Sequence, residues 1–200
     1  MSLTVNSGSS TNFEPVSEGV HIAVCNMLID LGMQYSEYYK TSSRQVMIGW
    51  EIPDETMELD DGPVPRQITQ KYTASLNQKS TLRNVLESWR GKKFTDKELA
   101  GFDLRNIVGK TCQISVTHTV MQNGKVYAGV GAVMALPKGV APVQLSSPPT
   151  VYDIDANPLE AVDDLPAWIA EQIKKSTSYQ EKLTAGPKME DLNDEGDLPF

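Results

Sequence analysis

Apolar positions in the first third of the chain follow the short repeat of β-strands. Residues 20–31 are mostly apolar and rich in Val and Ile, which predicts a strand buried on much of both faces. Residues 44–52 predict a second strand that ends at Pro53. Residues 67–76 alternate apolar and polar side chains and predict a half-buried third strand. The chain is therefore expected to begin with three strands.

The connection between the first two predicted strands, residues 34–43, is expected to be an exposed loop containing Tyr35, Tyr38 and Tyr39. Because tyrosine has an apolar ring and a polar hydroxyl, these side chains either bind a ligand or cover the core. The sequence leaves both interpretations open. On the third strand Tyr72 lies on the apolar side, so Lys71 is expected to face away from it.

The apolar repeat changes to that of a helix after Ser80, which is an N-cap candidate. Short helical turns are predicted after the cap residue Thr95 and over residues 103–108. The main helix has one apolar stripe at spacings of three and four, which stops at Gly91 and consists of Leu82, Val85, Leu86 and Trp89.

The last two predicted strands, residues 110–120 and 126–136, form a hairpin around Asn123-Gly124. The order strand, strand, strand, helix, strand, strand is that of the OB-fold, a five-stranded Greek-key barrel that binds oligonucleotides on one face and in two loops. The sequence therefore predicts a mainly β protein with helices, an OB-fold barrel with a helix between strands three and four. Such a fold does not assign a function, since OB-folds also bind sugars.

Composition divides the chain around this barrel, which is expected at residues 19–137. Residues 1–18 lack any apolar period and predict a flexible N-terminal arm, and residues 138–162 predict a proline-rich strap or linker. Residues 163–176 predict an amphipathic helix that docks on the barrel, a partner protein being the alternative surface. Residues 177–200 predict a disordered acidic tail. The apolar face of the helix is expected to comprise Trp168, Ile169 and Ile173.

Charge is unevenly distributed along the chain. The formal net charge is -8 at pH 7, yet residues 62–125 carry eleven bases and only four acids. Residues 1–61 carry ten acids and two bases, and residues 151–200 carry twelve acids and four bases. The middle of the chain is therefore suited to a polyanion although the total charge is negative.

The stretch at residues 66–94 combines seven cations with aromatic rings, against Glu87 as its one acid. A single strand offers a phosphate charge and a base face at every nucleotide, so cations beside rings bind it without sequence readout. The alternative is that the rings are core and the lysines lie on a solvated helix face. On the OB-fold arrangement the predicted DNA-binding residues are Arg44, Trp50, Arg66, Lys71, Tyr72, Lys79, Arg83, Arg90, Lys92, Lys93, Lys125 and Tyr127.

Motifs of catalysis are lacking, because no P-loop, dinucleotide fingerprint or zinc-finger spacing is present. We expect no enzyme activity, no cofactor and no metal. A zinc site built from His21, Cys25, Cys112 and His118 on neighbouring strands is conceivable, but two buried core cysteines with free thiols are the favoured interpretation. The acids within residues 54–61 are interpreted as a solvated loop rather than a metal nuclease site.

The expected cellular location rests on the absence of targeting and membrane-spanning patterns in the sequence. The sequence has no apolar run of membrane-spanning length and no signal-peptide pattern, and it has only two cysteines. We expect a soluble cytoplasmic protein without membrane contact.

The C-terminal residues carry a resemblance. The string DEGDLPF resembles the acidic tip of bacterial single-stranded DNA-binding proteins, which ends in Ile-Pro-Phe or Leu-Pro-Phe and recruits replication, recombination and repair enzymes. Glu195 and Gly196 make this version less uniformly acidic. The resemblance implies a protein-interaction tip comprising Asp194, Glu195, Asp197, Leu198, Pro199 and Phe200.

The body of the chain, from about residue 19 to 176, resembles a family of bacteriophage and prophage single-stranded DNA-binding proteins. The strings that carry the resemblance are YTASLNQKSTLRNVLESWRGKKF, GFDLRNIVGK and LPAWIAEQIKKS. It implies a phage protein of the host cytoplasm that coats single-stranded DNA and recruits enzymes. The alternative is an adaptor or recombination and replication loader whose barrel binds only proteins. The number of copies in the assembly stays open, a homo-oligomer included.

Overall fold

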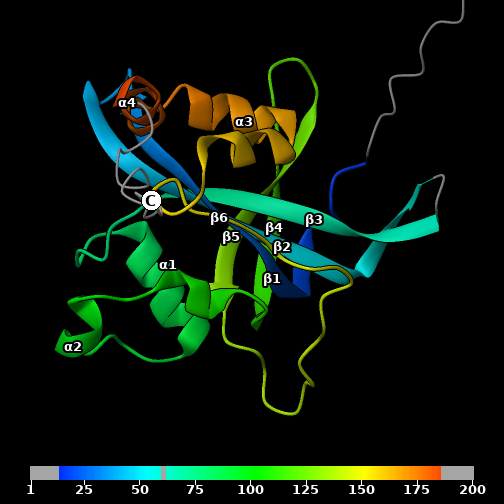
Figure 1. The fold of residues 1–200 in the computed structure, drawn as a ribbon. Helices are drawn as coiled ribbons and strands as arrows, with labels where there is room; N and C mark the ends of the chain where they lie inside the picture. The colour runs from blue at the N-terminus through cyan, green and yellow to red at the C-terminus, as the bar shows by residue number, and fades with distance from the viewer. Residues whose placement is uncertain (1–13, 60–61, 186–200) are drawn as a thin grey trace, which may run out of the picture.

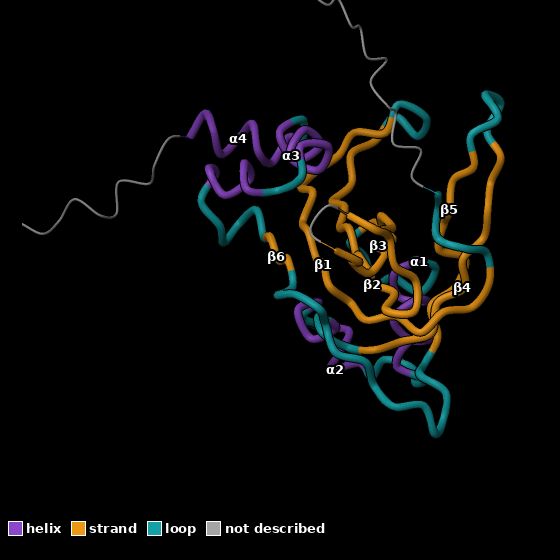
Figure 2. The backbone as a smooth tube through the Cα atoms, turned by 90° about the vertical axis from the view of Figure 1, so that its right-hand side faces the viewer, coloured by secondary structure: helices purple, strands orange, loops and turns teal. Residues whose placement is uncertain are grey.

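The protein is mainly β, and its sheet is antiparallel apart from one short strand and curls into a half-barrel (Figure 1). The structure is a computed structural model that describes residues 14–59 and 62–185. The strands follow the order β3-β2-β1-β4-β5, and the short β6 adds to β1 in parallel. The view in Figure 2 is turned by 90° and shows the strands curling around the inside of the half-barrel. The strands are β1 (Gly19–Ser36), β2 (Thr41–Leu59), β3 (Gly62–Thr73), β4 (Thr111–Val120), β5 (Val126–Met134) and β6 (Thr150–Tyr152).

The first three strands are confirmed but are longer than predicted. β1 and β2 continue through most of the expected loop, and only residues 37–40 turn between them. β2 also passes Pro53, where its pairing with β3 is interrupted between Ile52 and Thr56 and then resumes. Proline has no N–H to donate, so it is tolerated at this irregularity rather than ending the strand.

Helix α1 (Thr81–Arg90) begins after Ser80 and ends at Gly91, which has a left-handed φ of 65°. α2 (Asp96–Leu99) follows Thr95 in a complete capping box with Glu98, and the 3₁₀ helix η1 (Leu104–Ile107) follows Asp103. These three helical predictions are confirmed. The Ser80 hydroxyl, however, donates to the Ser75 carbonyl and makes no capping bond.

Two apolar cores lie on opposite sides of β1 and β2. The first fills the inside of the half-barrel and includes Trp50, Leu86 and Ile114, together with both cysteines. The cysteines are free, as expected, and burial raises the pKa of Cys25 to about 12. The second core places Ile169 and Ile173 against β1 and β2.

This second core confirms that the C-terminal helix docks on its own sheet. The helix is α3 (Ala167–Lys174), preceded by the 3₁₀ helix η2 (Leu159–Asp164). Trp168 departs from the prediction, because its side chain remains 48% exposed.

The ends of the barrel domain differ from the predicted boundaries. Val16, expected in the flexible arm, is buried in the first core, and its carbonyl accepts from the His118 ring at 2.7 Å. β6 forms within the predicted linker. Residues 177–185, expected in the disordered tail, form helix α4 (Thr177–Ala185). In each case contacts with distant segments supply the burial that local composition lacks.

No helix within the described ranges is long and apolar enough to cross a bilayer.

Candidate nucleic-acid interface

Two of the predicted DNA-binding aromatics lie in the core. The Trp50 side chain is fully buried and Tyr72 is 6% exposed, both inside the half-barrel. Each occupies an inward-facing position of its strand, whereas Lys71 faces outward as expected. A base cannot stack on a ring that is already packed on both faces, so Trp50 and Tyr72 are withdrawn from the interface.

Several predicted cations are held by carboxylates. Arg44 bonds Asp30 and Asp155, and the bond with Asp30 is the main cause that raises the pKa of its guanidinium. Arg90 bonds Glu98 and lies 4.4 Å from the centre of the Phe94 ring. Arg44 and Arg90 thus form ion pairs within the protein. The paired carboxylates offset the charge that these arginines could offer to a phosphate. Arg66 likewise donates to the Glu14 carbonyl.

Glu87 is the central acid of the predicted basic stretch, and it is buried on α1. Its carboxylate accepts from Lys93 Nζ at 2.7 Å, from Arg83 Nε at 3.0 Å and from the Phe94 N–H at 3.3 Å. These bonds, the one with Lys93 foremost, lower the pKa of Glu87 to about 2. Arg83 and Lys93 thus complete a clamp that fixes the end of α1.

We expect replacement of Glu87 by glutamine to remove part of the acid sensitivity of folding. Because the pKa of Glu87 is about 2 when folded and near its ordinary value of 4.5 when unfolded, its stabilisation is complete above pH 4.5 and is lost as the pH falls toward 2. Thermal unfolding at pH 7 and pH 3 measures the effect. The E87Q variant should start less stable and lose less on acidification than the unchanged chain. An equal loss in both proteins would contradict the clamp.

Four predicted lysines remain exposed and make no ion pair with the described residues. They are Lys71 on β3, Lys79 before α1, Lys92 after α1 and Lys125 in the β4–β5 loop. Their charges are available to a polyanion.

Exposed tyrosines stand on the two hairpins that project from the half-barrel. Tyr38 and Tyr39 in the β1–β2 turn are 86% and 74% exposed, and their rings meet edge-to-face at 4.8 Å. Tyr127 at the start of β5 is 55% exposed, beside Lys125. Figure 1 shows both hairpins pointing to the top of the view. The tyrosine loop left open by the sequence is thus exposed rather than a cover for the core, and Tyr35 is exposed with it.

Strands β3, β4 and β5 carry no acidic residue, whereas β1 and β2, which lie between β3 and β4 in the sheet, carry Asp30, Glu51, Asp54, Glu55 and Glu58. Residues 62–86, which include β3, and residues 104–152, which include β4 and β5, contain neither Asp nor Glu. The outward side chains of β3 are Gln67, Thr69, Lys71 and Thr73. A phosphate backbone following the outward row of β3 therefore meets an amide, hydroxyls and one lysine without repulsion from that strand.

A polar hollow of about 360 Å³ continues this surface at the N-terminus of α1. It is lined by Thr73, Ser75, Asn77, Lys79, Ser80 and Thr81. The first turn of α1 has no acid and the Ser80 side chain does not cap it, so the N–H groups at this helix end contribute positive potential beside the hollow. The hollow adds a favourable electrostatic environment for phosphate next to Lys79.

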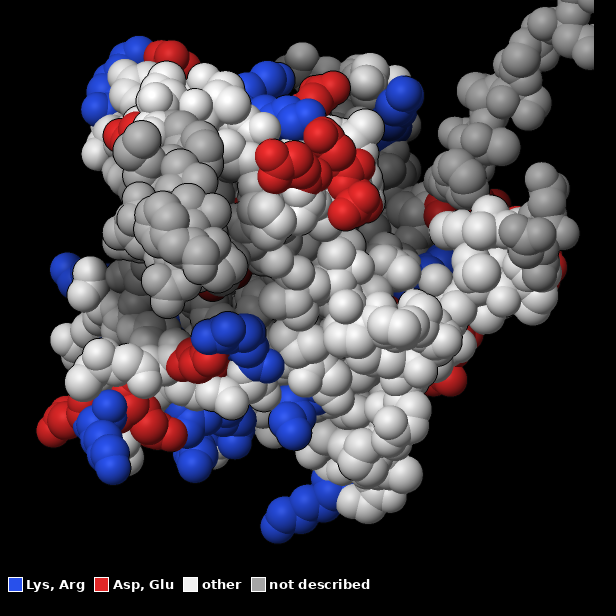
Figure 3. Space-filling model, in the orientation of Figure 1, with Lys and Arg blue, Asp and Glu red and all other residues white. Residues whose placement is uncertain are grey.

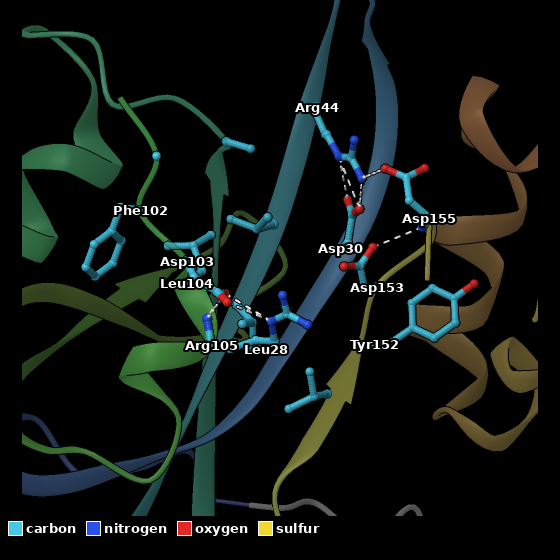
Figure 4. Close-up of a pocket in the computed structure, with 14 residues that line it drawn as sticks. Leu28, Asp30, Arg44, Phe102, Asp103, Leu104, Arg105, Tyr152, Asp153 and Asp155 are labelled. Atoms are coloured by element: carbon cyan, nitrogen blue, oxygen red, sulfur yellow. Dashed lines mark hydrogen bonds and ion pairs between the residues drawn. The ribbon is translucent and has the colours of Figure 1, made fainter. Parts of the chain in front are cut away.

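Another hollow, of about 550 Å³, lies elsewhere and has a different charge. Figure 4 shows Arg44 between Asp30 and Asp155 on one wall, and Asp103 bonded to Arg105 on the other. Its lining contains four aspartates, Asp153 included, and two arginines, so it disfavours a phosphate backbone.

Within the described ranges, the grouping of potential metal ligands is Asp30, Asp153 and Asp155. The guanidinium of Arg44 already bonds two of these carboxylates. His21, Cys25, Cys112 and His118 form no such grouping within those ranges, and the two histidine rings bond the backbone carbonyls of Ser17 and Val16.

Figure 3 shows Lys and Arg along the lower edge of the molecule, over α1, α2 and the loop between β5 and β6, with acidic side chains among them over α1 and α2. A group of acidic side chains lies at the upper side, over the C-terminal helical region, where Lys and Arg are also present. The protein-interaction tip predicted from sequence lies outside the described residues.

No protein-family model matches the chain, and no curated protein sequence is significantly similar to it.

Proposed function

We propose that this protein binds single-stranded DNA without sequence readout and is not an enzyme. The observation that carries the proposal is the pair of projecting hairpins, which present Tyr38 and Tyr39 next to the Lys40–Glu37 ion pair and Tyr127 near Lys125. Exposed rings stack on any base, at about 1–3 kcal/mol per base. Duplex DNA keeps its bases stacked inside, so it offers the rings no face and should bind more weakly.

An OB-like barrel is the fold we propose for this function. The antiparallel order with β1 between β2 and β4, and α1 between β3 and β4, supports it. In OB-folds the strand runs across the second and third strands and between two loops, which here correspond to the β1–β2 turn and the β4–β5 loop. The outward row of β3 containing Lys71 borders that path, while the neighbouring Met47 of β2 is buried in the second core.

The resemblance to phage single-stranded DNA-binding proteins supports the same proposal. By that resemblance the tip ending in Phe200 recruits replication, recombination or repair enzymes in the bacterial cytoplasm.

A titration of the full chain with a fluorescent 30-nucleotide strand tests the proposal. We expect tight binding at low salt, a steep loss of affinity as salt rises, and much weaker binding of the matching duplex. The K71E/K79E variant should bind more weakly and reduce the magnitude of the salt slope by about 1.4, because two phosphate contacts of a single strand are lost. The matched control is K175E, since Lys175 is an exposed lysine of the C-terminal region. Failure of the unchanged chain to bind either nucleic acid would overturn the proposal and favour a protein adaptor.

Deletion of residues 189–200 is expected to tighten binding of the strand at low salt. This segment carries five acids and no base, and it competes with phosphate for the basic surface. The difference between the two proteins should vanish at high salt, where the charges are screened. Affinity that is unchanged or lower after deletion would exclude the competition.

A further inference from the structure

A hollow of about 410 Å³ lies between α1, η1 and the chain that follows β5. Its walls are largely apolar and come from Leu86, Trp89, Phe102, Ile107 and Leu136. This volume is within the range of about 300–1,000 Å³ that is usual for ligand sites. Neither the tyrosine hairpins nor the outward row of β3 side chains lines this hollow, so it is a separate site.

The aromatic walls are fixed by contacts within the protein. Trp89 Nε1 donates to the Thr111 carbonyl at 3.2 Å. The Phe102 ring packs edge-to-face on Phe94 at 5.0 Å, and the guanidinium of Arg90 lies 5.3 Å from its centre. The hollow is therefore formed in advance of any ligand, and a flat group entering it meets rings that are already oriented.

The rim of the hollow is polar and basic. Asn106 and Lys110 line it and are exposed, and Lys138 follows two residues after Leu136. Residues 104–152 contain no acid, and the nearby carboxylate of Glu98 is bonded to Arg90. An apolar slot beside uncompensated lysines fits a ligand that joins a flat ring to negative charge.

We propose that this hollow holds an unstacked base of the bound strand, with Lys110 and its neighbours on the flanking phosphates. The inference rests on the proposed function and adds a second contact region, remote from the hairpins. The amide of Asn106 offers both a donor and an acceptor to a base edge. The strand then extends from the tyrosine hairpins to this hollow, and the length of DNA covered by one protein molecule increases accordingly.

Two variants test the site by separate means, L136D inside the hollow and K110E on its rim. Binding is measured with a 30-nucleotide oligothymidylate, as affinity and as the number of nucleotides covered per protein, with K175E as the charge-matched control. Each variant should lower the affinity about fivefold or more and shorten the covered length, whereas K175E should change neither. Circular dichroism and thermal unfolding establish that the variants are folded.

The outcomes separate this inference from the function on which it rests. If the unchanged chain does not bind the strand, the proposed function fails. If it binds, and folded K110E matches it in affinity and covered length, the hollow is not a base site. The inference is also overturned if a labelled peptide of residues 186–200 binds the chain deleted of that segment and K110E abolishes this binding while leaving DNA affinity unchanged. The hollow would then be a site for an acidic peptide.

Discussion

Replacing Tyr38 and Tyr39 together by alanine is expected to weaken the binding of single-stranded DNA by about 30-fold or more. The two side chains are the most exposed large apolar residues of the described chain, and neither packs in a core. If each ring stacks on one base at about 1 kcal/mol or more, losing both costs about 2 kcal/mol, which corresponds to that factor. Because the residues lie in an exposed turn, stability should change little.

The matched control is the Y38F/Y39F variant, which keeps both rings and removes only the hydroxyls. It should bind within about twofold of the unchanged chain if stacking supplies the affinity. Fluorescence anisotropy at fixed salt measures all three proteins. Equal affinity of the alanine pair and the unchanged chain would show that the β1–β2 hairpin does not contact DNA.

Replacing Trp50 by alanine is expected to destabilise the fold by about 3–5 kcal/mol. The Trp50 side chain is fully buried, 6.0 Å from Trp89 between ring centres, in the first core. Removing it leaves a cavity among side chains that cannot all collapse into the space. For a chain of this length the midpoint of thermal unfolding should fall by about 6–20 °C.

Two further variants distinguish a core role from a binding role for this ring. Tyr127 is exposed, so Y127A should change the unfolding midpoint little and weaken DNA binding. W50F keeps an aromatic ring in the core and should fold and bind DNA like the unchanged chain. If W50F is as stable as the unchanged chain but binds DNA more weakly, Trp50 contributes to DNA binding.

The secondary structure could be predicted from the sequence to a large extent because its signals are local. The capping box of Thr95 and Glu98, the glycine at the end of α1 and the Asn123-Gly124 hairpin each depend on residues within a few positions. The strand ends were less predictable. Pro53 is a local stop signal, but pairing of β2 with β3 on both sides of it keeps the strand intact.

The candidate interface was predictable only in part, because exposure is not a local property. Lys71, Lys79, Lys92, Lys125 and Tyr127 remain candidates, and Tyr38 and Tyr39 join them. Tyr38 and Tyr39 were visible in the sequence as part of a tyrosine-rich turn. The sequence alone did not determine whether their rings are exposed or cover the core. The folded hairpin, which projects beyond the sheet, removes that alternative.

By itself the sequence determined that this chain has a β-rich middle with one amphipathic helix and a basic centre flanked by acidic segments. Those features follow from periodicity and charge, which are read along the chain. Only the tertiary structure decided that Trp50 is inside and Tyr38 outside, that Asp155 reaches Arg44 across 111 positions, and that α3 covers one side of β1. Burial and ion pairing depend on which distant segments meet, and that is fixed by the packing of the whole sheet rather than by any single stretch.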